Sequence, residues 1–144
     1  MACNLETLKE KLNLNDIKGK KIILYFYPKD NTKGCTLEAI EFSSLKEEFE
    51  KQNAIVIGVS KDSLESHKKF KEKNNLNLDL ISDESLEILK YFDVWKLKKM
   101  CGKEYMGTVR STFILDDKLN ILKEFRNVKA KGHANFILQT LKEM

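Results

Sequence analysis

The chain has 144 residues, of which 42% are hydrophobic and 33% charged, and its net charge is +4. This balance is typical of one globular domain spanning residues 1–144, and it excludes disordered and fibrous proteins. The basic residues are almost all lysines interleaved with glutamates, a pattern of solvated helix faces that argues against a nucleic-acid partner.

No apolar run approaches the ~20 residues that a membrane span needs, and the first ten residues lack the apolar core of a signal peptide. The three cysteines, Cys3, Cys35 and Cys101, are widely spaced and odd in number, unlike the disulfide framework of a secreted domain. We therefore predict a cytoplasmic protein with reduced thiols and no membrane partner.

The first half of the chain alternates strands with helices. Apolar runs predict buried strands over 21–27 and 54–59. Between them, apolar residues at spacings of three and four predict a helix over 35–51. A second, lysine-rich helix is expected to end near residue 73.

The middle of the chain continues this alternation. We expect the lysine-rich helix to turn Leu64 and Phe70 inward. The alternating run 76–81 predicts a strand, and 84–92 predicts a short helix. The polar stretch 93–107 is expected to be an irregular loop.

The last third predicts two strands over 109–115 and 119–125, joined as a tight hairpin, and a final helix that begins near Gly132. This order of elements gives a mixed central sheet, parallel at first and then antiparallel, with helices on both faces. The predicted fold class is α/β, a three-layer α/β/α sandwich of thioredoxin-like architecture.

The most informative segment is the octet 28–35, PKDNTKGC, which lies between the first strand and the first helix. A cysteine in the first turn of a helix meets unpaired N–H groups and the positive end of the helix dipole, and both favour the thiolate. Cys35 lacks the C-x-x-C spacing, so dithiol exchange within one motif is excluded. The octet predicts nucleophilic thiol chemistry.

The octet, with Pro28, Thr32, Gly34 and Cys35, resembles the active-site signature of the peroxiredoxins, in particular the bacterioferritin comigratory protein (Q-type) subgroup. The run KMCGKEYMGTVRSTF at 99–113 is similar to the subgroup's segment that carries an arginine, here Arg110. The resemblance implies a thioredoxin-like fold and a thiol-specific peroxidase that reduces hydrogen peroxide and organic hydroperoxides through a sulfenic acid.

The roles that the resemblance implies agree with the chemistry of each residue type. Arg110 is expected to stabilise the thiolate and the leaving oxygen, and the Thr32 hydroxyl to face the sulfur or the peroxide. Pro28 is expected to wall the site. Glu38, one helical turn after the cysteine, is expected to hold the arginine, and Thr36 to assist at the helix start.

The chain departs from the subgroup at the position five residues after Cys35, where many members carry a resolving cysteine and this chain has Ile40. Three recycling routes are open. The sulfenic acid reacts directly with an external thiol, or Cys101 resolves it after a loop movement, or Cys3 or another subunit does so.

The expected partners are a peroxide and a thiol reductant, namely thioredoxin, glutaredoxin or a low-molecular-weight thiol, and the expected state is a monomer. The two histidines lack metal-ligand spacing with the cysteines, so we expect neither a metal nor a cofactor. An alternative function is a redox sensor or chaperone-like protein that turns over poorly, since Ile40 removes the usual resolving step.

Overall fold

A five-stranded mixed sheet forms the centre of the fold in the computed structural model, which describes residues 8–12 and 17–144. Its strand order is β3-β2-β1-β6-β7. The first three strands are parallel, and β6 and β7 run antiparallel to their neighbours. The strands are β1 (Lys21–Phe26), β2 (Ala54–Ser60), β3 (Asp79–Ser82), β6 (Ser111–Leu115) and β7 (Ile121–Phe125).

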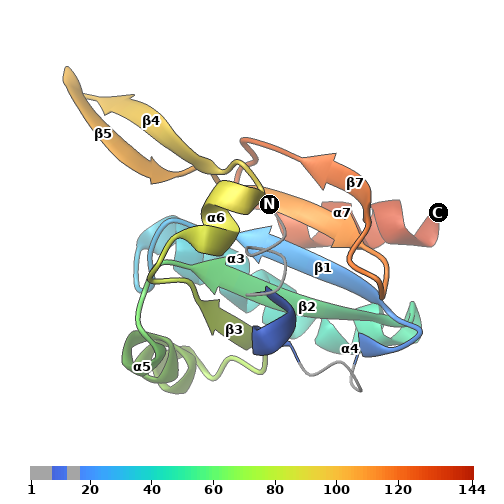
Figure 1. Cartoon of the computed structure of the whole chain (residues 1–144). Coiled ribbons are helices and arrows are strands. Elements are labelled where there is room, and N and C mark those ends of the chain that lie inside the picture. The colour runs from blue at the N-terminus through green and yellow to red at the C-terminus, as the bar shows by residue number, and fades with distance from the viewer. Residues whose placement is uncertain (1–7, 13–16) are drawn as a thin grey trace.

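Helices cover both faces of this sheet (Figure 1). They are α3 (Lys33–Ser44), α4 (Lys46–Lys51), α5 (Leu64–Asn74), α6 (Glu87–Tyr91) and α7 (His133–Lys142). The α/β sandwich predicted from the sequence is therefore confirmed. Within the described ranges, no helix has the length and apolar character to cross a bilayer.

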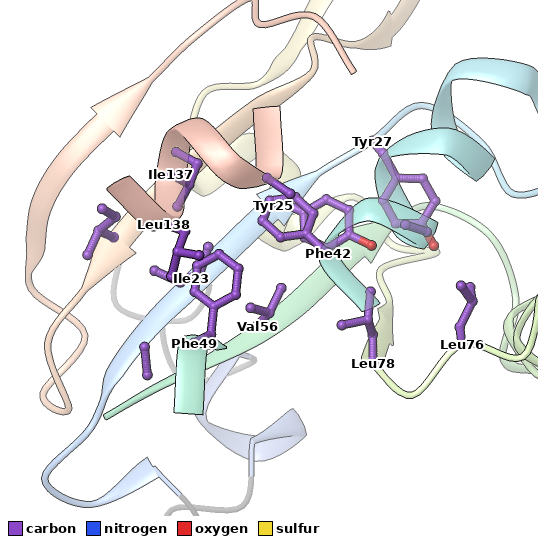
Figure 2. Packing of buried hydrophobic residues seen from close by; sticks show 14 of the residues in the cluster. Ile23, Tyr25, Tyr27, Phe42, Phe49, Val56, Leu76, Leu78, Ile137 and Leu138 are labelled. Atoms are coloured by element: carbon purple, nitrogen blue, oxygen red, sulfur yellow. The ribbon is translucent and has the colours of Figure 1, made fainter. Parts of the chain in front are cut away.

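Strand β1 divides the core into two halves because its side chains alternate between the faces of the sheet. Ile23 and Tyr25 pack with residues of α3, α4 and α7. Figure 2 shows this half, with the Tyr25 ring lying against Phe42 of α3. Ile22 and Leu24 face the other way, toward α6 and residues 8–12.

Two helix predictions need correction. The helix expected over 35–51 is two helices, α3 and α4, which meet at Leu45. The Ser44 hydroxyl bonds to the carbonyl oxygen of Glu41 and competes with the helical pattern there. In α5, Phe70 is buried as expected, but Leu64 is 72% exposed, and His67 takes the inward position instead.

The largest error concerns 93–107, which is not an irregular loop. It forms a two-stranded hairpin of β4 (Trp95–Met100) and β5 (Lys103–Thr108), paired along its whole length. Cys101 and Gly102 make its two-residue turn, with φ values of 52° and 80°, as a type I′ turn requires. The hairpin projects from the body of the domain (Figure 1), so Cys101 lies at an exposed tip.

The glycine in the middle of β2 predicts a stability effect. A Cβ atom on Gly58 would lie 2.7 Å from Cζ of Tyr25 and 2.8 Å from Cδ2 of Leu80. Because Tyr25 is fully buried, Gly58→Ala overpacks the core, and we expect it to lower the free energy of unfolding by about 1–3 kcal/mol. Urea denaturation measures this loss. An unchanged midpoint would contradict the prediction, because it would show that Tyr25 and Leu80 can shift to make room for the methyl group.

Candidate active site

Cys35 lies in the first turn of α3, at the point where the chain leaves the carboxyl end of β1. The first intrahelical bond runs from the Thr36 N–H to the Thr32 carbonyl at 2.9 Å. The N–H groups of residues 33–35 precede that bond and form the positive end of the helix. Cys35 is 1% exposed, so its sulfur is held inside this turn rather than on the surface.

Arg110 reaches the same place from the start of β6. Strand β6 pairs antiparallel with β1, with Ser111 opposite Phe26, and this register sets Arg110 beside the end of β1. Its Nη2 lies 3.3 Å from Sγ of Cys35, within hydrogen-bonding distance for sulfur. The guanidinium and the thiol, 75 positions apart in the chain, therefore form one site.

Gly34 allows the guanidinium to come this close. A Cβ atom on Gly34 would lie 3.2 Å from Nη2 of Arg110 and 3.9 Å from Cβ of Ala130. A side chain at this position would press on the guanidinium directly. The glycine of the signature thus has a steric reason in this structure.

Glu38 holds the other arm of the guanidinium. Its Oε1 accepts from Nη1 of Arg110 at 2.5 Å, and its side chain is fully buried. Burial raises the pKa of Glu38 to about 7, although the Arg110 charge and hydrogen bond oppose that shift. Burial alone would lower the pKa of Arg110, but Glu38 and Cys35 outweigh it and raise the pKa. The guanidinium stays charged and bridges the carboxylate and the thiol.

The remaining signature residues lie in the loop after β1 and in the first turn of α3. Thr32 is the N-cap residue of α3, but its exposed hydroxyl donates to the Lys29 carbonyl at 2.8 Å and makes no capping bond. Its oxygen lone pairs remain able to accept from a peroxide. Thr36 contributes its N–H to the first helical bond. Pro28 is half-buried just after β1.

The structure adds a second cation that sequence reasoning missed. Lys98 of β4 donates from Nζ to the Thr108 carbonyl at 2.8 Å, two residues before Arg110. Burial and then the Arg110 charge lower the pKa of Lys98, while Cys35 opposes the shift. One lysine among many gives no signal in the sequence, and its position depends on a hairpin that the sequence did not predict.

The two other cysteines lie apart from this site or outside the description. Cys101 is exposed at the hairpin tip, and Cys3 falls outside the described residues. Ile40 is 43% exposed on the outer face of α3. Among the described residues, no group of three or more His, Cys, Asp and Glu side chains is arranged to hold a metal ion.

A thioredoxin-like domain that sets a buried thiol at a helix start against a guanidinium defines the class of thiol peroxidases. Comparison with known proteins agrees with this class. The profile of the AhpC/TSA family matches residues 2–124. Peroxiredoxin Bcp of Bacillus subtilis is 54% identical over 135 residues, which are 94% of this chain and 86% of that protein.

Solved structures give the same result. The bacterioferritin comigratory protein of Xanthomonas campestris, described with alkyl peroxide reduction activity, matches with a TM-score of 0.82 at 42% identity, covering 87% of this chain and 80% of that one. A mutant of PrxQ from Xylella fastidiosa matches with a TM-score of 0.86 at 42% identity, covering 92% and 82%. The chain belongs to the AhpC/TSA family, among the Bcp or Q-type peroxiredoxins. It is a thiol peroxidase, and the family reduces peroxides at the expense of thiols.

Proposed function

We propose that Cys35 is the peroxidatic residue and that Arg110 is its main catalytic partner. The observation that carries this proposal is the 3.3 Å contact between Nη2 of Arg110 and Sγ of Cys35 at the start of α3. The thiolate attacks the terminal oxygen of the hydroperoxide, the O–O bond breaks, and the sulfur becomes a sulfenic acid. The other oxygen leaves as an alkoxide or hydroxide and takes up a proton to give alcohol or water.

Arg110 acts on both charges of this step. Its planar fork faces the sulfur, and negative charge moves from that sulfur onto the leaving oxygen as the O–O bond breaks. Glu38 is a positioning residue, because it fixes the guanidinium through Nη1 and leaves Nη2 directed at Cys35. Gly34 leaves the room that this approach needs.

Thr32, Pro28 and Thr36 complete the proposed pocket for the peroxide. The Thr32 hydroxyl donates its hydrogen bond to the Lys29 carbonyl, so its oxygen is left as an acceptor for the peroxide O–H. Pro28 has no N–H and a fixed φ, which suits a wall that limits water. Thr36 closes the first helical turn through its N–H.

The proposed substrates are hydrogen peroxide and organic hydroperoxides. The alkyl peroxide reduction described for the Xanthomonas campestris relative supports the second class. The site needs no metal or cofactor for this chemistry, since the nucleophile and the charge stabilisation both come from side chains and helix N–H groups.

For recycling we propose direct attack by an external thiol, from thioredoxin, glutaredoxin or a low-molecular-weight thiol. Cys101 is poorly placed for this task. It lies at the far end of strands that are fully paired, and the six residues of β5 alone span roughly 20 Å at ~3.3 Å per residue. A bond between Cys35 and Cys101 would require the hairpin to bend as a unit rather than a loop to move.

We further propose that residues 1–144 act as one domain, as a monomer, in the cytoplasm. Both halves of the core share the central sheet, which supports a single folding unit. The odd number of cysteines in the sequence, with Cys101 exposed, suits a reducing compartment.

Mass spectrometry after one equivalent of peroxide, under non-reducing conditions with a sulfenic-acid trap, tests the recycling route. We expect the trap on Cys35 alone, no link between Cys35 and Cys101, and full turnover of Cys101→Ser with a thioredoxin system. A Cys35–Cys101 disulfide, or loss of turnover in Cys101→Ser, would contradict the one-cysteine route. Trapping without turnover by any thiol donor would instead favour the redox-sensor reading.

A further inference from the structure

A second buried cluster lies beside the loop that leads to Cys35, and the peroxide chemistry does not use it. Asp30, five residues before Cys35, is 4% exposed, and His67 of α5 is 3% exposed. Their side chains contact directly, with Nδ1 of His67 2.7 Å from Oδ2 of Asp30. A buried ionisable pair this close to a nucleophile is a candidate for a role in the reaction.

Both ring nitrogens of His67 face acceptors. Nδ1 faces the Asp30 carboxylate, and Nε2 lies 2.9 Å from the Ile81 carbonyl oxygen. A neutral imidazole has one N–H and would leave its other lone pair against an oxygen, so this geometry requires the imidazolium. Burial alone would lower the pKa of His67, but Asp30 and the Ile81 carbonyl outweigh it and raise the pKa above its usual value.

The Asp30 carboxylate is fully engaged as well. Oδ1 accepts from the Tyr27 hydroxyl at 2.6 Å, and Oδ2 accepts from the Ser66 hydroxyl at 2.8 Å besides His67. The backbone N–H of Asp30 donates to Oδ2 of Asp62 at 2.8 Å. Asp30 thus connects the loop after β1 to three parts of the fold. It bonds to α5 through Ser66 and His67, to the segment before α5 through Asp62, and indirectly to β3, because His67 also bonds to Ile81.

The bonds of Asp30 anchor the loop at a point very close to Cys35 along the chain. Only Asn31 and Thr32 separate Asp30 from the start of α3, and Asn31 has a left-handed φ of 65°, which turns the chain sharply. Cys35 itself is 1% exposed, so a reductant thiol cannot reach an oxidised sulfur unless this loop and the first turn of α3 move. The strength of the anchor therefore affects how readily the sulfur is reached.

We propose that Asp30 and His67 are positioning residues for Cys35: their ion pair holds the loop 28–35 so that the sulfur faces Arg110, and its loss lets the sulfur become accessible. The inference rests on the proposed role of Cys35. It predicts opposite effects on the two half-reactions, because oxidation needs the held conformation and reduction needs the released one.

The pair gives this equilibrium a pH dependence with a definite sign. Because the pKa of His67 is raised in the fold, the stabilisation is fully present below its ordinary value of about 6.5 and is lost as pH rises through the raised pKa. Accessibility of Cys35 should therefore increase with pH beyond the effect of thiol ionisation. The titratable groups that face His67 or line the groove beside it are Asp30, Tyr27, Asp62, Lys68, Lys71 and Glu72.

The experiment uses the full chain with Cys3→Ser and Cys101→Ser, so that only Cys35 reacts. The rate of its alkylation by a neutral, bulky maleimide is measured from about pH 5 to about pH 9 and divided by the thiolate fraction from absorbance. We expect the corrected rate to rise about tenfold through one inflection in the parent protein. His67→Gln and Asp30→Asn should be fast at all pH values, with no inflection.

His133→Gln is the matched control. His133 is also buried, but it bonds to the Thr112 hydroxyl, and burial with the Arg110 charge lowers its pKa to about 4, so it stays neutral over this range. This variant should keep the inflection. In separate half-reactions, with the native cysteines, His67→Gln should be oxidised more slowly by peroxide and reduced faster by dithiothreitol.

An inflection that survives in His67→Gln, a parent protein without one, or equal changes in both half-reactions would overturn the proposal. Nitrogen NMR of the His67 ring provides a check that needs no variant. Two protonated ring nitrogens are expected at neutral pH, and a single one would also overturn it. Because alkylation does not involve peroxide, a negative result here leaves the role of Cys35 as peroxidatic residue untouched.

Discussion

Cys35→Ser is expected to lose peroxide turnover, by a factor on the order of 10³ or more, because a serine hydroxyl is not ionised near neutrality and is a poor nucleophile. The surrounding site should remain, since the substitution removes one sulfur from a turn whose backbone bonds do not depend on it. NADPH consumption through thioredoxin and its reductase, with hydrogen peroxide or cumene hydroperoxide, measures the loss.

Cys101→Ser is the control in the same assay. It carries the same chemical change at an exposed hairpin tip, and it should retain the parental rate. Equal rates for the parent protein and Cys35→Ser would show that the peroxidase activity resides elsewhere in the chain.

Arg110→Lys is expected to reduce kcat/KM for the peroxide by about 10²–10³, the range seen when one preorganised donor is removed from an active site. The arginine spans two partners, Sγ of Cys35 and Oε1 of Glu38, with two nitrogens of one rigid plane. A lysine ammonium is a point charge that can serve one partner but cannot bridge both in the same way.

Arg126→Lys tests whether loss of any guanidinium would do the same. Arg126 donates to the carbonyls of Phe92 and Asp93 and lies over the Phe113 ring, away from the thiol. Its replacement should lower thermal stability and leave kcat/KM for the peroxide unchanged. Single-turnover oxidation by stopped flow separates the chemical step from recycling, and equal losses in both variants would argue against a specific role for Arg110.

The sequence predicted the elements that bury apolar residues on a regular period. Apart from Lys21 and Ser60 at their ends, strands β1 and β2 are continuous apolar runs, so their identity did not depend on the rest of the fold. The meeting of Cys35 with Arg110 came from the family resemblance, because a contact across 75 positions leaves no periodic signal. The register of β6 on β1 is what brings the two together.

The hairpin of β4 and β5 was missed because its side chains are mostly exposed, so it lacks the apolar alternation that marks a half-buried strand. Its one local signal was Cys101-Gly102, where glycine suits the second residue of a type I′ turn. His67 stands beside two lysines in the sequence and gives no local signal of burial. Its partners Asp30 and Ile81 lie far from it in the sequence. No local pattern shows that a carboxylate and a carbonyl this distant bond to the two nitrogens of one ring.

The ion pair between Glu38 and Arg110 has a consequence for the return half of the catalytic cycle. Glu38 lies about one turn further along α3 than the thiol, so the opening of the first turn proposed above would leave the carboxylate in the remaining helix. We expect the guanidinium to stay bonded to Glu38 while the sulfur is being reduced. The reduced thiol would then return to a charge partner that is already in position for the next peroxide.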